Sequence, residues 1–189
     1  MSETQVYLCP CCDKAITADT TICPQCKQPV TVSSTSLAAM PLPQVSKYLK
    51  GFSKAVDTNP DNQAANGQAA MCFLRMKLYD KAMPLFEKAI DGNYDSADPY
   101  FMAAICLLRG KKPFLAQRAE IDKAVEYLNA ANMIEPRAIH YLLLSFIKRD
   151  YFERKYLNIA PSADEEAATA AQLGATDTDR ETLKTLLAI

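Results

Sequence analysis

A self-similarity with a period of 34 residues constrains the fold of this chain more than any other feature. Phe52 recurs 34 positions later as Phe86, and Cys72 recurs at the same distance as Cys106. Apolar residues in this part of the chain follow helical spacing, and periods of this length are typical of stacked helix pairs. Each pair leaves an apolar face that its neighbour must cover, so the sequence predicts a mainly α-helical solenoid.

A second pair of similar segments is separated by an insertion. The segment that begins at Asp80 recurs at Asp122, a shift of 42 rather than 34, which places eight extra residues between the two copies. Gly110 and Pro113 interrupt the helical pattern in that interval, so we expect the inserted residues to form a loop over 109–118.

This pattern resembles the tetratricopeptide repeat (TPR) family over about residues 45 to 150. Helix pairs of that family place small residues where helices cross and larger residues where they interlock. Residues of these two kinds fall on those positions in two repeats: Ala69, Ala70, Phe73, Ala82, Phe86 and Ala89 in the first, and Tyr100, Ala103, Ala104, Leu107, Ala124, Leu128 and Ala131 in the second. A third repeat begins near Tyr141, but its second helix matches poorly.

The resemblance implies a binding groove lined by the first helix of each pair. In this register the groove positions are Met71, Leu74, Arg75, Phe101, Ile105, Leu108, Arg109, Leu142 and Phe146. Most of these residues are apolar, so the expected partner is a protein or peptide, and an amphipathic helix suits such a groove.

The last part of the chain is predicted to cap the array. Ser162 and Thr178 each precede a glutamate by three residues, the signature of a capping box, and so predict two helix starts. Residues 159–189 carry a net charge of −4 and residues 44–158 a net charge of +4, so the acidic segment is expected to dock on the repeats.

Five of the seven cysteines lie within 18 residues near the start of the chain. Cys9 and Cys12 form one Cys-x2-Cys hook, and after ten residues Cys23 and Cys26 form another. Two such turns aim four thiolates at one ion, and thiolates select zinc or iron over harder cations. A short hairpin with strands near 15–18 and 21–22 would fill the gap between the hooks.

The segment from 7 to 30 resembles the zinc ribbon, or rubredoxin-like, family, whose hooks read Cys-Pro-x-Cys. Pro10 and Pro24 match it, whereas Lys27 replaces the usual glycine of the second hook. The resemblance implies one structural Zn²⁺ held by Cys9, Cys12, Cys23 and Cys26. Cys11 then stands apart from the ligands, free to replace a neighbour or to face solvent.

Two other roles for the ribbon stay open at this stage. A nucleic-acid-associated regulator is disfavoured, because residues 1–30 carry a net charge of −1 and a zinc centre with four thiolates adds a formal −2, which repels phosphate. An iron redox protein is disfavoured because rubredoxin-type sites are surrounded by aromatic residues, whereas only Tyr7 is near this cysteine cluster in the sequence.

Composition excludes most catalytic chemistry. The chain has one histidine, His140, and five glycines, which leaves little material for acid–base triads or phosphate cradles. Cys72 and Cys106 are expected to be buried packing groups. No apolar run is long enough to span a membrane, and no export signal is recognisable, so we expect a cytoplasmic protein.

These observations predict a mainly α fold, a TPR-type α-solenoid of helix hairpins with a small N-terminal β-hairpin zinc ribbon. The expected organisation is a ribbon over 1–28, a linker over 29–43, TPR-like repeats over 44–158 and capping helices over 159–189. The expected function is that of a noncatalytic protein–protein interaction adaptor, with no enzyme activity, no small-molecule substrate and no membrane partner.

Overall fold

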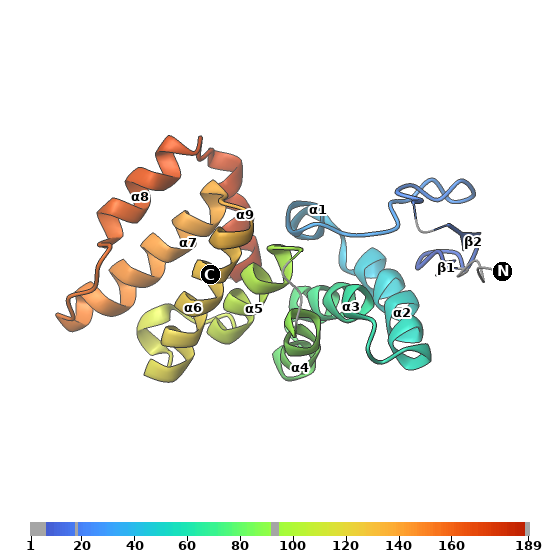
Figure 1. The fold of residues 1–189 in the computed structure, drawn as a ribbon, viewed down its shortest axis with the longest axis horizontal. Helices are drawn as coiled ribbons and strands as arrows, with labels where there is room; N and C mark the ends of the chain where they lie inside the picture. The colour runs from blue at the N-terminus through green and yellow to red at the C-terminus, as the bar shows by residue number, and fades with distance from the viewer. Residues whose placement is uncertain (1–6, 18, 92–94, 188–189) are drawn as a thin grey trace. The chain divides into compact units, whose positions relative to one another are not determined.

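The computed structural model describes residues 7–17, 19–91 and 95–187 (Figure 1). The chain divides into two compact units, Met1–Ala89 and Ile90–Ile189, and each is described by itself. The described residues are mainly helical, which confirms the predicted fold class.

The first unit begins with the ribbon and continues into helices. Its elements are β1 (Tyr7–Leu8), β2 (Ala15–Ile16), α1 (Ser34–Ala39), α2 (Leu42–Thr58), α3 (Gln63–Arg75) and α4 (Tyr79–Ile90). Helix α3 packs against both α1 and α2. A three-residue turn separates α3 from α4, and the Lys81 ammonium of α4 lies 5.9 Å from the centre of the Phe73 ring of α3.

The second unit contains the remaining helices. They are α5 (Asp98–Leu108), the 3₁₀ turn η1 (Pro113–Leu115), α6 (Arg118–Ile134), α7 (Ala138–Ile147), the π-helical turn η2 (Lys148–Phe152), the 3₁₀ turn η3 (Glu153–Lys155), α8 (Ala163–Gln172) and α9 (Asp177–Leu187). Helix α5 packs on α6, and α7 packs on α8. The predicted insertion loop is confirmed: α5 ends at Leu108, and Arg109 and Gly110 adopt positive φ.

The small and large residues of the repeat pattern form the packing surfaces. Ala82, Phe86 and Ala89 of α4 have no exposed surface, and the corresponding residues of α6 do not either: Ala124, Leu128 and Ala131. Alanine lets two helix backbones approach closely, and the larger side chain fills the space beside the crossing. The register deduced from the repeat, with its shift of 42 residues between these two helices, is therefore the register of the core.

Some local elements differ from their prediction. The 29–43 stretch contains α1, which begins at a capping box between Ser33 and Ser36 and buries Leu37. Strand β2 pairs with β1 in the register Tyr7↔Ile16, and Ile22 bridges to Pro29. The expected pairing of 15–18 with 21–22 is therefore wrong. Each pair of extended segments flanks one cysteine hook instead. Ala18, which belongs to the expected strand, lies outside the described residues.

The two predicted capping boxes have different outcomes. Ser162 caps α8 as predicted, because its hydroxyl accepts from the N–H of Glu165 and the Glu165 carboxylate accepts from the N–H of Ser162. The cap predicted at Thr178 is wrong. Thr176 takes that role, exchanging equivalent hydrogen bonds with Asp179, so α9 begins two residues earlier.

Candidate functional site

Two cysteine hooks with the same backbone geometry form the ribbon. In the first, the N–H of Asp13 donates to the carbonyl of Cys9 over 2.9 Å, and in the second the N–H of Lys27 donates to the carbonyl of Cys23 over 2.9 Å. Asp13 has φ 56° and Lys27 has φ 57°, so both turns close through a left-handed residue. This tight turn directs the two sulfurs of each Cys-x2-Cys pair toward the same point.

The hooks bring the four predicted sulfurs together. The Sγ atoms of Cys9, Cys12, Cys23 and Cys26 all lie within 4.8 Å of one another. Sγ of Cys9 is 3.7 Å from that of Cys26, and Sγ of Cys12 is 3.6 Å from that of Cys23. Sulfurs about 2.3 Å from a tetrahedral zinc ion stand about 3.8 Å apart, so the donor set fits a single tetrahedral metal ion.

The ribbon has a very small core of its own. Cys9, Ile16 and Cys23 are buried, and the residues packed against them are Cys11, Cys12, Cys26 and Val30. A core made largely of thiols buries little apolar surface, so a segment of this kind depends on a metal cross-link for its fold.

Backbone groups and burial act on the thiols in opposite directions. N–H groups of Cys26 and Gln25 lower the pKa of Cys23 to about 6, which favours the thiolate. Burial raises the pKa of Cys9 and also that of Cys11. Cys11 stands outside the group of four sulfurs, with its side chain half-buried against the ribbon core.

One face of α2 holds the ribbon. The Gln44 amide donates to Gln28 Oε1 over 2.9 Å, and the Tyr48 hydroxyl donates to the Pro29 carbonyl over 2.7 Å. Lys54 reaches Asp13 at 3.8 Å. The three positions of α2 are spaced as one helical stripe, so the ribbon rests on the helical part of the first unit.

Gly51 lies on the same stripe. A β-carbon at this position would lie 2.3 Å from the carbonyl oxygen of Pro10 and 2.4 Å from its Cα. The backbone of the first cysteine hook therefore rests directly on the α2 backbone, and only glycine leaves the space. Beside this contact, a cavity of about 340 Å³ is lined by residues that include Ile16 and Phe52.

The groove residues predicted in the first unit lie on α3. Met71 and Leu74 are buried, with 2% and 3% of their surface exposed. Arg75 is half-buried, and its guanidinium donates from Nε to the Leu37 carbonyl over 3.2 Å and from Nη2 to that of Ala38 over 3.5 Å. Arg75 thus satisfies carbonyls at the end of α1, a contact that the sequence pattern did not indicate.

The remaining predicted groove residues lie in the second unit. Phe101, Ile105 and Leu108 of α5 are almost wholly buried. Arg109 is exposed just after α5. On α7, the predicted groove residues Leu142 and Phe146 are partly exposed. Helix α9 packs against both α5 and α7, the two helices that carry these residues.

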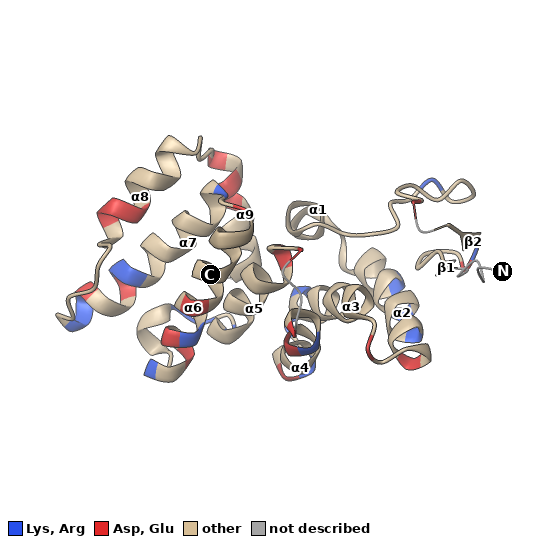
Figure 2. Ribbon diagram, in the orientation of Figure 1, with Lys and Arg blue, Asp and Glu red and all other residues tan. Residues whose placement is uncertain are grey.

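Charge separates the first and second helices of the pairs. Arg75 is the single charged residue of α3 and Asp98 that of α5, whereas α7 has none. Charges of both signs are interspersed along α4 and α6 (Figure 2). The first helices are therefore apolar and largely buried, whereas the second helices carry a solvated, charged surface.

His140 occupies a packing position. Its Nδ1 lies 3.0 Å from the Asn132 side-chain oxygen, and its ring centre is 4.9 Å from that of Phe101. Burial, reinforced by the charge of Arg137, lowers the pKa of His140 to about 3. The imidazole is neutral at ordinary pH and wholly enclosed, which does not suit an acid–base catalyst.

Comparisons with solved structures support the helical-repeat fold. The chain is similar to "MamA 41-end from Desulfovibrio magneticus RS-1", with 18% identity and a TM-score of 0.56 over 74% of this chain and 71% of that one. It is also similar to "MamA RS-1 ArsTM double mutant", with 18% identity and a TM-score of 0.55 over 74% and 70% of the two chains. "MamA MSR-1 C2" gives 15% identity and a TM-score of 0.52 over 74% and 72%.

These neighbours are TPR-like helical-repeat proteins, and identities this low speak for the fold alone. No family model and no curated protein sequence matches the chain. Within the part of the chain that the structure describes, no helix combines the length and the apolarity that crossing a membrane requires.

Proposed function

We propose that this protein is a noncatalytic scaffold for protein–protein interaction, with a partner-binding face on the first helices of its TPR-like pairs and one structural Zn²⁺ in its ribbon. The observation that carries this proposal is the separation of charge between first and second helices. First helices that are almost uncharged would give a protein or peptide partner an apolar face wherever these helices are accessible.

The residues proposed to bind the partner are those of the predicted groove. Leu142 and Phe146 stand four residues apart on α7 and are partly exposed, so they are the apolar groove residues that a partner reaches first. The buried Phe101, Ile105 and Leu108 of α5 would join the interface once the face is uncovered. We place the protein in the cytoplasm, because thiols clustered in this way persist in a reducing compartment.

The proposed role of zinc is structural. Four thiolates at tetrahedral spacing fit Zn²⁺, which when bound cross-links two turns that have almost no core of their own. The metal-linked turns would also be fixed to the helices, because Tyr48, Gln44 and Gly51 hold the ribbon against α2. The ribbon then serves as a rigid cap on the first unit and as a second surface for a partner.

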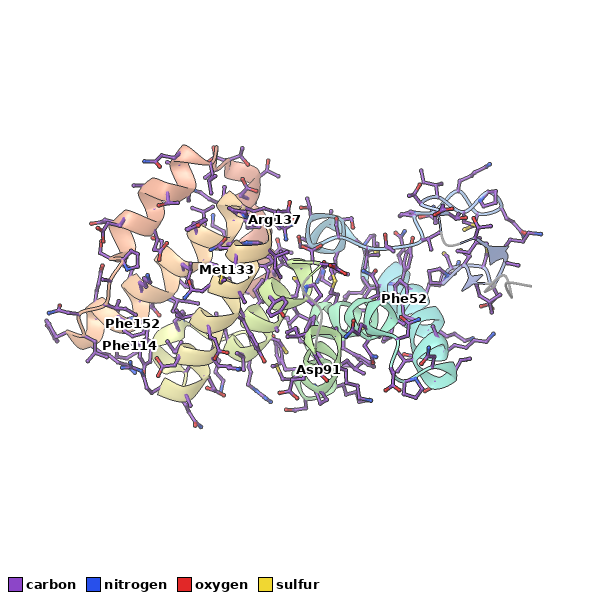
Figure 3. The ribbon with its side chains drawn as sticks, viewed as in Figure 1. Phe52, Asp91, Phe114, Met133, Arg137 and Phe152 are labelled. Carbon is purple, nitrogen blue, oxygen red and sulfur yellow. The ribbon has the colours of Figure 1, made fainter. Side chains whose placement is uncertain are left out.

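Two matched substitutions test the partner-binding face. Phe146→Glu puts a charge on the apolar face of α7. Met133→Glu makes the same kind of change on α6, at a residue that is 88% exposed and that Figure 3 labels. Proteins captured from native lysate by the unmodified chain are identified by mass spectrometry and measured again with each variant. We expect Phe146→Glu to lose the partner and Met133→Glu to keep it, with helicity unchanged in both.

The opposite pattern would move the interface to the second helices. If both variants keep the partner, the ribbon is the binding surface instead. If the captured material is nucleic acid, with affinity that falls steeply as salt rises, the scaffold proposal is wrong.

A further inference from the structure

Helix α9 does not continue the helical array. A helix that extended the stack would pack on the last pair, α7 and α8. Helix α9 instead packs against α7 and α5, which are the first helices of two successive pairs. It therefore turns back across the face that the predicted groove residues line.

The buried side of α9 is apolar. Leu183, Leu186 and Leu187 are 4–7% exposed, and they follow the i, i+3, i+4 spacing of one helical stripe. The charged residues Glu181 and Lys184 are exposed and pair with each other within the helix. This is how an amphipathic helix binds in a groove, with one stripe of anchors inward and a solvated back.

Helix α8 is attached in a different way. Its Glu166 forms a buried ion pair with Lys148, whose ammonium also donates to the Pro161 carbonyl over 2.7 Å. Asp164 of α8 pairs with Arg149. Among the described residues, the ion pair of α9 lies within the helix itself, so α9 relies on its leucine stripe while α8 is tied to α7 and its extension by charge as well.

Elements held by few contacts open first, without unfolding the rest of a domain. Release of α9 would expose the apolar faces of α5 and α7 and leave the buried ion pair of α8 in place. The same face would then be available to another helix with the same stripe.

We propose that α9 is a displaceable internal ligand of the α5–α7 face, and that the partner is an amphipathic helix with leucines at i, i+3 and i+4 that replaces it. This inference rests on the proposed function of that face. The structure is then the closed state, and the partner's affinity is reduced by the fraction of molecules in which α9 is docked.

Hydrogen exchange on the unmodified full-length chain tests whether α9 opens locally. We expect the amides of α9 to exchange at least tenfold faster than those of α8, a helix of similar length, under conditions where global unfolding is rare. If α9 exchanges as slowly as α7 and α8, it is an integral part of the unit and the proposal is wrong.

A peptide tests whether the uncovered face binds a helix in trans. The probe is a fluorescent synthetic peptide of residues 176–189, added to three full-length proteins: the unmodified chain, Leu186→Asp and Thr185→Asp. Leu186 is buried and Thr185 is exposed on the same helix, so the two variants differ in whether the new charge enters the contact. We expect Leu186→Asp to bind the peptide at least tenfold more tightly than the other two proteins do, and a peptide carrying Leu186→Asp not to bind.

Equal binding by all three proteins would overturn the proposal, and so would a Leu186→Asp variant whose circular dichroism falls by much more than one helix. The milder Leu183→Ala variant, which leaves a hole in the same stripe, should give an intermediate gain. These results stand apart from the test of the scaffold. Peptide binding without partner capture would keep α9 as a ligand and remove the scaffold role, whereas partner capture with slow exchange of α9 would do the reverse.

Discussion

The ribbon and the helical pairs of this chain solve the problem of a small fold in different ways. The ribbon core contains Cys9, Ile16 and Cys23, and three further cysteines pack against it. The helical pairs interlock through alanines beside larger apolar residues, such as Leu128 between Ala124 and Ala131, none of them exposed. We therefore expect the ribbon to depend on a bound metal ion and the helical pairs on the fit of their side chains, so the two should fail under different treatments.

Removal of one metal ligand should have the largest effect of any single change. Zinc contributes about 10 to 16 kcal/mol of apparent free energy to small four-ligand sites, far more than any one side chain contributes to packing. We expect Cys23→Ser to lose the single zinc ion and Cys11→Ser to retain it, because the Cys11 sulfur stands outside the group of four. Elemental analysis of the purified variants measures this directly.

Chelation should separate the two regions further. The ribbon should unfold, and α2 should lose protection against hydrogen exchange because its stripe no longer has a partner. Helices α5 to α7 should keep their protection. If Cys23→Ser holds a full equivalent of zinc, or if visible absorption reveals iron, the structural zinc assignment is wrong.

A cavity in the helical core should produce the opposite pattern. Leu128→Ala removes a wholly buried side chain from α6 and should lower the free energy of unfolding by about 2 to 5 kcal/mol. Met133→Ala on the same helix alters a residue that is 88% exposed, so the free energy of unfolding should change by less than about 0.5 kcal/mol. Urea unfolding measures both variants.

Both α6 variants, Leu128→Ala and Met133→Ala, should keep the zinc content of the unmodified chain. A Leu128→Ala protein that lost its zinc would show that the two regions are coupled far more tightly than their cores suggest.

How far the sequence predicts each region depends on how local its determinants are. The four clustered sulfurs are positioned by two turns of four residues, so the spacing of the cysteines alone predicts which of them come together. The packing alanines recur at a shift of 34 residues, or of 42 where the insertion intervenes, so their register is also readable. The cap of α9 shows the limit. Thr176-x-x-Asp179 and Thr178-x-x-Glu181 are overlapping signatures, and nothing in the local pattern decides that the helix begins at the earlier one.

Tertiary contacts account for what sequence reasoning missed. Strands of two residues, such as β1 and β2, are too short to show alternation. The end of α1 is held by Arg75, which is 37 positions from Ala38 in the chain. Gly51 did give a signal, because a glycine within a helical pattern often marks a close backbone approach, but its partner, Pro10, becomes evident only in the structure.

Gly51→Ala tests the contact between the two regions through the sign of its effect. In an exposed helix this change stabilises by about 0.5 to 1 kcal/mol. Here the added carbon would lie 2.3 Å from the Pro10 oxygen, so the ribbon must move away from α2, and we expect a loss of about 1 to 3 kcal/mol instead. Ser53→Ala, in the same helix, provides the propensity control. Urea unfolding of the zinc-loaded proteins measures the effect. If Gly51→Ala stabilises the protein, the ribbon does not rest on this helix.

The smallest expected effect is confined to the ribbon and comes from the turn residues. Lys27 holds φ 57°, a conformation that costs an ordinary residue about 1 to 2 kcal/mol. Glycine adopts it without that cost but loses more entropy on folding, which reduces the gain from the substitution. Lys27→Gly should therefore strengthen the ribbon by up to about 1 kcal/mol, seen as a chelator midpoint raised by up to about fivefold. Asp13→Gly should gain less, because aspartate tolerates this conformation better and Asp13 also lies 3.8 Å from Lys54. Neither variant should change the urea unfolding of the helices, since the strain that glycine relieves lies in a turn whose stability depends on the metal. A gain from Asp13→Gly as large as that from Lys27→Gly would show that neither the tolerance of aspartate for this conformation nor its pair with Lys54 contributes to the metal site.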